Sequence, residues 1–151
     1  MNGGGNMRTD FKAAAVSAAV LIGLFLSPAA VSQDAMPAGV HFKEVVTPDG
    51  PVNVLADADG MTLYIFDMDR PQGGSVCNNQ CATYWPPLLA AEDAEDLGEW
   101  TVIARVDGSK MWAFRGRPLY TFAKDTSPAD FSGNNVPQDS PVWHYVHAEG
   151  Q

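Results

Sequence analysis

Apolar and polar residues alternate along two separate stretches of the chain, and the two stretches share one order of features. In each, an Asp-Gly pair lies between two apolar runs and a second glycine-containing turn follows. Each then ends in Leu-Tyr-x-Phe-x-x-Asp, at residues 63–69 and 119–125. Asp-Gly between alternating apolar residues is a strong signal for a β-hairpin. Each stretch is therefore predicted to form a three-stranded meander.

The aromatic residues of these stretches predict how the two meanders pack. Successive side chains of a strand point to opposite faces, so Tyr64 should share a face with Phe66, and Tyr120 with Phe122. A single small sheet is marginally stable in water, so we expect the two meanders to bury these faces together. The predicted fold class is mainly β: two tandem β-meander repeats packed as a compact sandwich-like or barrel-like domain with pseudo-twofold symmetry. One short helix is expected near the cysteines.

The N-terminal residues follow a different pattern. Arg8 and Lys12 precede an apolar run over residues 13–26. This run has the length of the apolar region of a secretory signal peptide and is short for a membrane-spanning helix of about 20 residues. Small residues follow it, and we expect cleavage after Ser32, with Ala38 as a second candidate. An uncleaved membrane anchor is the alternative.

The expected cleavage and the repeats divide the chain into five segments. These are a signal peptide at 1–32, an N-terminal extension at 33–44, a first β repeat at 45–90, an acidic linker at 91–99 and a second β repeat at 100–151. The start codon encodes Met1 or Met7. No cysteine follows the apolar run as a lipid attachment site. The mature protein is therefore expected in the periplasm or outside the cell, without a stable membrane anchor.

The net charge of the chain argues against some classes of binding partner. The formal net charge is −9 at pH 7, and an acidic protein repels nucleic acid and anionic lipid headgroups. We expect a protein partner or a small-molecule ligand, and no nucleic acid.

Cys77 and Cys81 are the two cysteines of the chain. Exported cysteines are exposed to an oxidising environment, and on one helical turn their Cα atoms would lie ~6 Å apart, within reach of a disulfide. A disulfide and no cofactor are therefore predicted. The alternative is a copper-type metal or redox site formed by Cys77, Cys81 and His144. An irregular oxygen site for another metal ion is a further alternative, because four aspartates lie between residues 57 and 69.

The paired Leu-Tyr-x-Phe-x-x-Asp segments supply the candidate binding residues. A carboxylate three residues after a strand aromatic can accept backbone N–H groups of the following turn, or a tyrosine hydroxyl. In a functional interpretation, the same residues would form two symmetry-related pockets with aromatic walls and one acid each, suited to an apolar or cationic ligand. The candidates are Tyr64, Phe66, Asp69, Tyr120, Phe122, Asp125 and Trp85.

The order of these motifs resembles a family of bacterial secreted-repeat proteins, often predicted lipoproteins, that is described by a Tyr-x-(Phe/Trp/Tyr)-x-x-Asp motif. The resemblance covers roughly residues 45–147. It rests on Gly-x-Thr-Leu-Tyr-x-Phe-Asp-x-Asp at 60–69, Ser-x-Cys-x-x-x-Cys-Ala-x-x-Trp-Pro-Pro-Leu at 75–88 and Gly-x-Pro-Leu-Tyr-x-Phe-x-x-Asp at 116–125. This chain differs from the family in lacking the lipid-attachment cysteine. The resemblance implies export and a repeated fold, and no particular activity.

Signatures of common enzymes are missing from the sequence. It contains no Gly-x-Ser-x-Gly nucleophile elbow, no His-Glu-x-x-His and no phosphate-binding glycine-rich loop. We therefore predict a non-catalytic binding or interaction module. A periplasmic copper-type metal or redox protein that uses Cys77 and Cys81 is the alternative.

Overall fold

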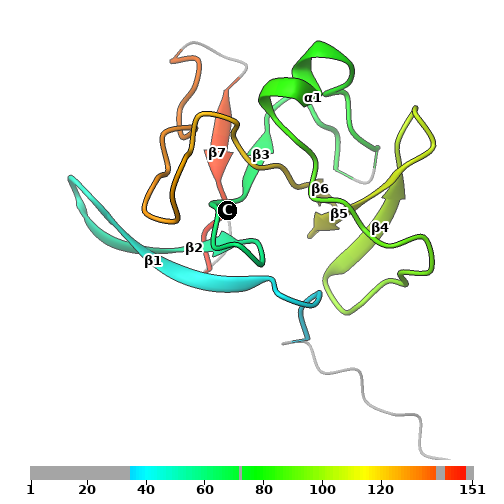
Figure 1. The fold of residues 1–151 in the computed structure, drawn as a ribbon, viewed down its shortest axis with the longest axis horizontal. Helices are drawn as coiled ribbons and strands as arrows, with labels where there is room; N and C mark the ends of the chain where they lie inside the picture. Colours follow the sequence, from blue (N-terminus) through cyan, green and yellow to red (C-terminus); the bar gives the residue numbers. More distant parts are fainter. Residues whose placement is uncertain (1–34, 72, 139–141, 149–151) are drawn as a thin grey trace, which may run out of the picture.

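The computed structural model describes residues 35–71, 73–138 and 142–148, and Figure 1 shows how their elements are arranged. The expected signal peptide and the cleavage site after Ser32 lie outside these residues. The elements are β1 (His41–Thr47), β2 (Gly50–Ala56), β3 (Tyr64–Phe66), α1 (Gln80–Tyr84), β4 (Trp100–Ala104), β5 (Lys110–Phe114), β6 (Arg117–Pro118) and β7 (Trp143–Tyr145). Within the described residues, no helix has both the length and the apolar character that a membrane crossing requires.

The mainly β class and the two hairpins predicted from the Asp-Gly pairs are confirmed. β1 pairs antiparallel with β2, and β4 pairs antiparallel with β5. Gly50 and Gly108 follow the two aspartates with φ of 121° and 87°, which a residue with a Cβ rarely adopts. β1 begins at His41, before the repeat boundary that the sequence placed at residue 45. The predicted helix near the cysteines is α1.

The third strand of the first repeat differs from the prediction of a simple meander. β3 forms its ladder with β7, which lies at the end of the second repeat. Beside this ladder, three backbone hydrogen bonds close a ring. The Leu63 N–H donates to the Leu55 carbonyl (2.9 Å), the Leu55 N–H to the Val146 carbonyl (2.8 Å), and the Val146 N–H to the Leu63 carbonyl (3.1 Å). A segment of the second repeat therefore completes the first.

The second repeat contains the same ring. The Leu119 N–H donates to the Trp112 carbonyl (3.1 Å), the Trp112 N–H to the Leu88 carbonyl (2.8 Å), and the Leu88 N–H to the Leu119 carbonyl (2.8 Å). Leu88 belongs to the first repeat, so the exchange of segments is reciprocal. Tyr64 and Tyr120 join the two halves, because each N–H donates to the other's carbonyl at 2.8 and 3.0 Å. The pseudo-twofold axis passes between these two residues.

The alternation of side chains divides the interior into two clusters, as the sequence predicted. Leu63 and Ile65 face an aliphatic and tryptophan cluster, whereas Tyr64 faces an aromatic cluster with Phe66 packed against it. The buried members of the first cluster are Leu55, Leu63, Ile65, Trp100, Phe114, Leu119 and Val146. Those of the second are Tyr64, Cys77, Trp85, Met111, Tyr120, Phe122 and Trp143.

Candidate functional site

Four aromatic rings form one continuous stack at the centre of the molecule. Trp85 and Trp143 lie face to face with ring centroids 3.8 Å apart. Phe66 stacks on Trp143 and Phe122 stacks on Trp85, each at 4.2 Å. Each phenylalanine thus packs against the tryptophan of the other repeat. The aromatic residues of the two motifs meet in a single cluster, and they do not line two separate pockets.

The two tyrosine hydroxyls and the two motif aspartates also pair across the repeats. The Tyr64 hydroxyl donates to Asp125 Oδ2 at 2.5 Å, and the Tyr120 hydroxyl donates to Asp69 Oδ2 at 2.7 Å. The other oxygen of each carboxylate accepts the N–H of a following loop, that of Val76 at Asp69 (2.8 Å) and that of Ser132 at Asp125 (3.0 Å). These are the hydrogen bonds that the spacing of the motif predicted for a structural aspartate.

Burial controls the protonation of this cluster. Tyr64 and Tyr120 have no exposed surface. Burial raises the pKa of each tyrosine well above its ordinary value, and the neighbouring carboxylate raises it further, so both hydroxyls remain protonated donors. Burial also raises the pKa of the Asp69 carboxyl. Buried groups that satisfy one another in this way stabilise the fold and present little of the motif to a ligand.

Gly133 shows how tightly the aromatic cluster is packed. Its N–H donates to the Tyr64 hydroxyl at 3.2 Å. A Cβ at this position would lie 2.9 Å from both the Trp85 ring and the Tyr64 ring. The backbone approaches these rings so closely that only glycine fits.

A disulfide joins Cys77 and Cys81, as predicted, with a Cα–Cα distance of 5.2 Å. It lies in the segment of residues 73–84, which we call the disulfide loop and which ends in α1. Cys77 is buried against the aromatic cluster, whereas Cys81 is partly exposed. The disulfide therefore connects the central cluster to the surface of the loop.

Arg105 holds the disulfide loop from the second repeat, and the sequence analysis missed it. Its guanidinium donates to the Cys77 carbonyl and to Ser75 Oγ, both at 3.0 Å, and to Asn78 Oδ1 at 3.3 Å. Its side chain is 2% exposed. Ser75 Oγ lies 2.7 Å from the Tyr120 hydroxyl, and because the one phenolic proton goes to Asp69, the Ser75 hydroxyl is the donor of this bond. An arginine just before an Asp-Gly turn carries no signal of burial, because only the folded loop supplies its acceptors.

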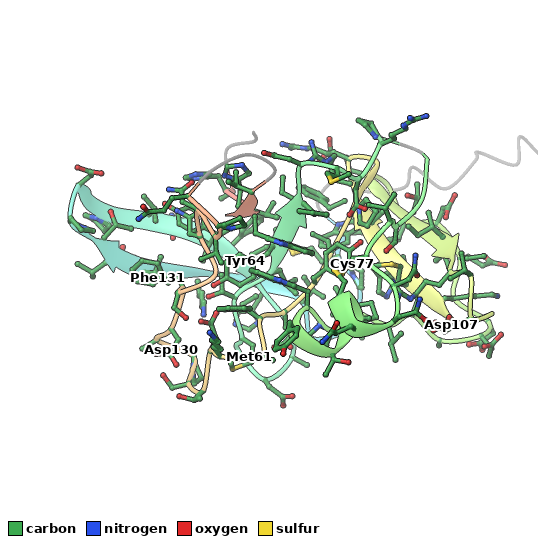
Figure 2. The ribbon with its side chains drawn as sticks, turned by 90° about the horizontal axis from the view of Figure 1, so that it is seen from above. Met61, Tyr64, Cys77, Asp107, Asp130 and Phe131 are labelled. Carbon is green, nitrogen blue, oxygen red and sulfur yellow. A yellow bond between two sulfur atoms is a disulfide. The ribbon has the colours of Figure 1, made fainter. Side chains whose placement is uncertain are left out.

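Apolar side chains are exposed on the disulfide loop and on the turn beside it. Val76 and Tyr84 are 51% and 50% exposed, and Val106, next to Arg105, is 82% exposed. Arg105 contacts the residues on both sides of Val76, so the segments that carry Val76 and Val106 are neighbours. Figure 2 shows Cys77 and Asp107 toward this end, and Asp130 and Phe131 toward the other, with Tyr64 between them.

The segment of residues 123–138 is the pseudo-symmetric counterpart of this region, and we call it the counterpart loop. Lys43 of β1 holds it by donating to the Pro128 carbonyl at 2.5 Å and to the Gly60 carbonyl at 2.7 Å. A surface hollow of 470 Å³ beside it is lined by Lys124, Ala129, Asp130, Phe131 and Ser132. The Asp130 carboxylate already accepts the N–H groups of Thr126 and Ser127, which lower its pKa.

The residues of the alternative metal site have other partners. The two cysteine sulfurs are bonded to each other, and His144 Nε2 lies 3.1 Å from Asp67 Oδ1. Across the described part of the chain, no three His, Cys, Asp or Glu side chains are grouped so that they could hold a metal ion. Asp57, one of the four clustered aspartates, accepts the N–H groups of Asp59 and Met61 and so stabilises its own turn.

Fold and site together define a two-repeat, disulfide-containing β protein whose signature residues form a shared core. The chain belongs to the family described as a secreted repeat of unknown function, whose model matches it twice, over residues 43–89 and 101–147. This confirms the predicted family and supports export. No curated protein and no solved structure matches the chain.

Proposed function

We propose that this protein is a non-catalytic interaction module that acts in the periplasm or outside the cell after removal of a signal peptide. The observation that supports it most is the contrast between the motif and the disulfide loop. Tyr64, Tyr120 and Asp69 are buried: the Tyr120 hydroxyl donates to Asp69, and the Tyr64 hydroxyl donates to Asp125, the symmetry counterpart of Asp69. The disulfide loop is held equally firmly, yet it exposes apolar side chains.

A firmly held surface with exposed apolar residues is suited to binding a protein. Exposed apolar groups gain free energy when a partner covers them. A loop that is already ordered loses little conformational entropy on binding, so more of that gain appears as affinity. The disulfide and the Arg105 hydrogen bonds restrict the loop. We propose Val76, Tyr84 and Val106 as the contact residues for a partner protein with a complementary apolar face.

The metal or redox alternative needs Cys77 and Cys81 as thiolates, because the thiolate is the form that binds metals and attacks disulfides. In the disulfide form neither sulfur is available. This alternative stays a hypothesis with its own test. The intact mass of the protein purified without reductant distinguishes a disulfide from two thiols, and metal analysis detects a bound copper ion.

The interaction proposal is tested by site-specific photo-crosslinking in cells that export the protein. A photoreactive residue at position 76 or 106 should capture one defined partner. The same residue at Lys124, an exposed position on the counterpart loop, is the matched control and should not capture it. Replacing both cysteines, Cys77→Ser with Cys81→Ser, should lower the capture severalfold and cost about 2 kcal/mol of stability, because the short covalent loop is opened.

Three outcomes would contradict the proposal. Capture at position 124 equal to that at 76 and 106 would show non-specific contact. Unchanged capture in the double serine variant would show that the ordered loop is not what the partner recognises. Two free thiols, or one bound copper ion per chain, would favour the metal or redox alternative.

A further inference from the structure

The outer edges of the two hairpins differ, although β1 and β4 hold equivalent places in the two repeats. In an antiparallel pair, residues that face each other without exchanging hydrogen bonds direct their N–H and C=O groups outward. Leu55 and Asn53 of β2 direct theirs away from β1, to Val146, Leu63 and Ala148. Their partners in register, Phe42 and Glu44, therefore point their backbone groups to the free edge of β1.

The same argument applies to β4. Trp112 directs its backbone groups to Leu88 and Leu119, so its partner Val102 points outward. The first half of this edge is covered. The Val102 N–H donates to Asp96 Oδ1 at 2.8 Å, and Trp100 exchanges two hydrogen bonds with Leu97 (2.9 and 3.0 Å). Asp96 and Leu97, which precede β4, thus supply hydrogen-bond partners for the outward backbone groups of Trp100 and for the Val102 N–H.

The segment before β1 does not cover its edge in this way. The Val40 N–H donates to the Pro37 carbonyl, as the Trp100 N–H does to that of Leu97, so the two segments correspond. Pro37 has no N–H to complete the pair. The residue that corresponds to Asp96 is Met36, which packs against the aliphatic core cluster and has no carboxylate. No other described residue bonds to the outward backbone groups of Phe42, Glu44 and Val46.

This uncovered edge has the features of a strand-addition site. Exposed edges are templates for pairing with another strand, and proteins that do not use them usually cover or charge them. β1 lies at the margin of the molecule in Figure 1. Its seven residues are long enough to pair with an extended peptide, and Val46 is 73% exposed at one end. We propose that β1 binds an extended segment of a basic partner protein by adding it as an antiparallel strand.

The charge of the edge indicates the chemistry of that segment. Glu44, in the middle of β1, is exposed, and Lys43 does not neutralise it, because its ammonium group is bonded to the Gly60 and Pro128 carbonyls. Opposite charges directly across a strand pair stabilise it, and like charges destabilise it. The added strand should therefore place a lysine or arginine opposite Glu44. A second copy of this chain is disfavoured, because pairing across the middle of β1 would oppose two Glu44 residues between two chains of charge −9.

The probe is a synthetic nine-residue peptide of alternating valine and lysine, capped at both ends, added to the mature protein. The readout is hydrogen exchange of individual backbone amides measured by NMR. In the free protein, the amides of Phe42, Glu44 and Val46 should exchange quickly. The peptide should slow these three at least tenfold and leave the disulfide loop unchanged. A peptide with glutamate in place of lysine should bind at least tenfold more weakly.

Substitutions at residue 44 separate the backbone from the charge. Glu44→Pro removes an outward N–H without breaking a β1–β2 hydrogen bond, and it should abolish the protection. Glu44→Ala keeps the N–H and should weaken binding of the basic peptide only severalfold. Glu44→Lys should reverse the preference and favour the acidic peptide. An N-methylated peptide tests the same point without altering the protein, and it should not bind.

The results that would overturn this proposal are equally defined. They are amides of β1 already protected in the free protein, protection at residues 76 and 106 in place of β1, or equal binding by Glu44→Pro and wild type. Self-association through β1, seen as protection that grows with protein concentration alone, would assign the edge to a second copy. Because the crosslinking positions 76 and 106 lie outside β1, failure of this proposal leaves the interaction proposal for the disulfide loop intact.

Discussion

The disulfide loop and the counterpart loop have the same place in the fold but are held by different chemistry. Each follows a Tyr-x-Phe-x-x-Asp segment and is held by one cation of the other repeat, Arg105 for the disulfide loop and Lys43 for the counterpart loop. The disulfide loop adds a covalent bond and a buried guanidinium. The fold needs both loops held, and the chemistry that holds them can vary.

The largest effects are expected where the two halves share their core. Trp85→Ala and Trp143→Ala should each cost ~3–5 kcal/mol of the free energy of unfolding, because each removes a ring from the centre of the stack. The two losses should be similar, since each tryptophan contacts its partner, one phenylalanine and one tyrosine. Urea denaturation measures both. A cost below 1 kcal/mol for either variant would show that the stack is not shared equally.

A smaller effect should distinguish the two cations. Arg105→Met should cost about 2–3 kcal/mol, because it removes the guanidinium donors to the buried Cys77 carbonyl and to Asn78 Oδ1. Lys43→Met should cost only about 1 kcal/mol, because water can reach the carbonyls of its partly exposed site. Methionine keeps most of the apolar stem in both variants. Equal losses in urea denaturation would remove the distinction between the loops.

The smallest expected effect is a dependence on pH. Burial raises the pKa of Asp69 above its ordinary 3.8, so the folded state holds this proton more tightly than the unfolded chain does. The contribution of Asp69 to stability is therefore complete below pH 3.8 and is lost as the pH rises through the raised pKa. Relative to Asp69→Asn, the wild-type Tm should fall in thermal unfolding as the pH rises above 3.8.

Asp107, on the turn beside the disulfide loop, is the control of opposite sign. Hydrogen bonds from the Ser109 hydroxyl and N–H lower its pKa, so its contribution is present above pH 3.8 and is lost as the pH falls through the lowered value. Relative to Asp107→Asn, the wild-type Tm should therefore rise with pH over the acid range. If the Tm difference from wild type changed with pH in the same direction for Asp69→Asn and Asp107→Asn, the buried environment assigned to Asp69 or the hydrogen-bonded one assigned to Asp107 would be wrong.

The sequence predicted the elements well because their signals are local. An Asp-Gly turn requires a glycine with positive φ whatever surrounds it, and alternation in residues 63–66 separates two faces in any sheet. It also predicted the hydrogen bonds of Asp69, since the acceptor and the following turn are close in sequence. It did not predict Arg105, whose acceptors lie 27–30 residues away.

By itself, the sequence determined the family, the repeat, the hairpins and the disulfide, because each depends on residues close together along the chain. Only the tertiary structure decided which repeat completes which. The rings of backbone hydrogen bonds at Leu63 and Leu119 each include a residue from the other repeat. This exchange brings the aromatic residues of the two motifs into one stack, where the sequence suggested two pockets. Among the described residues, the tertiary structure also decided that the first half of the β4 edge is covered and the β1 edge is open, because a carboxylate at Asp96 reaches an outward N–H, whereas Met36 packs against the core through its apolar side chain.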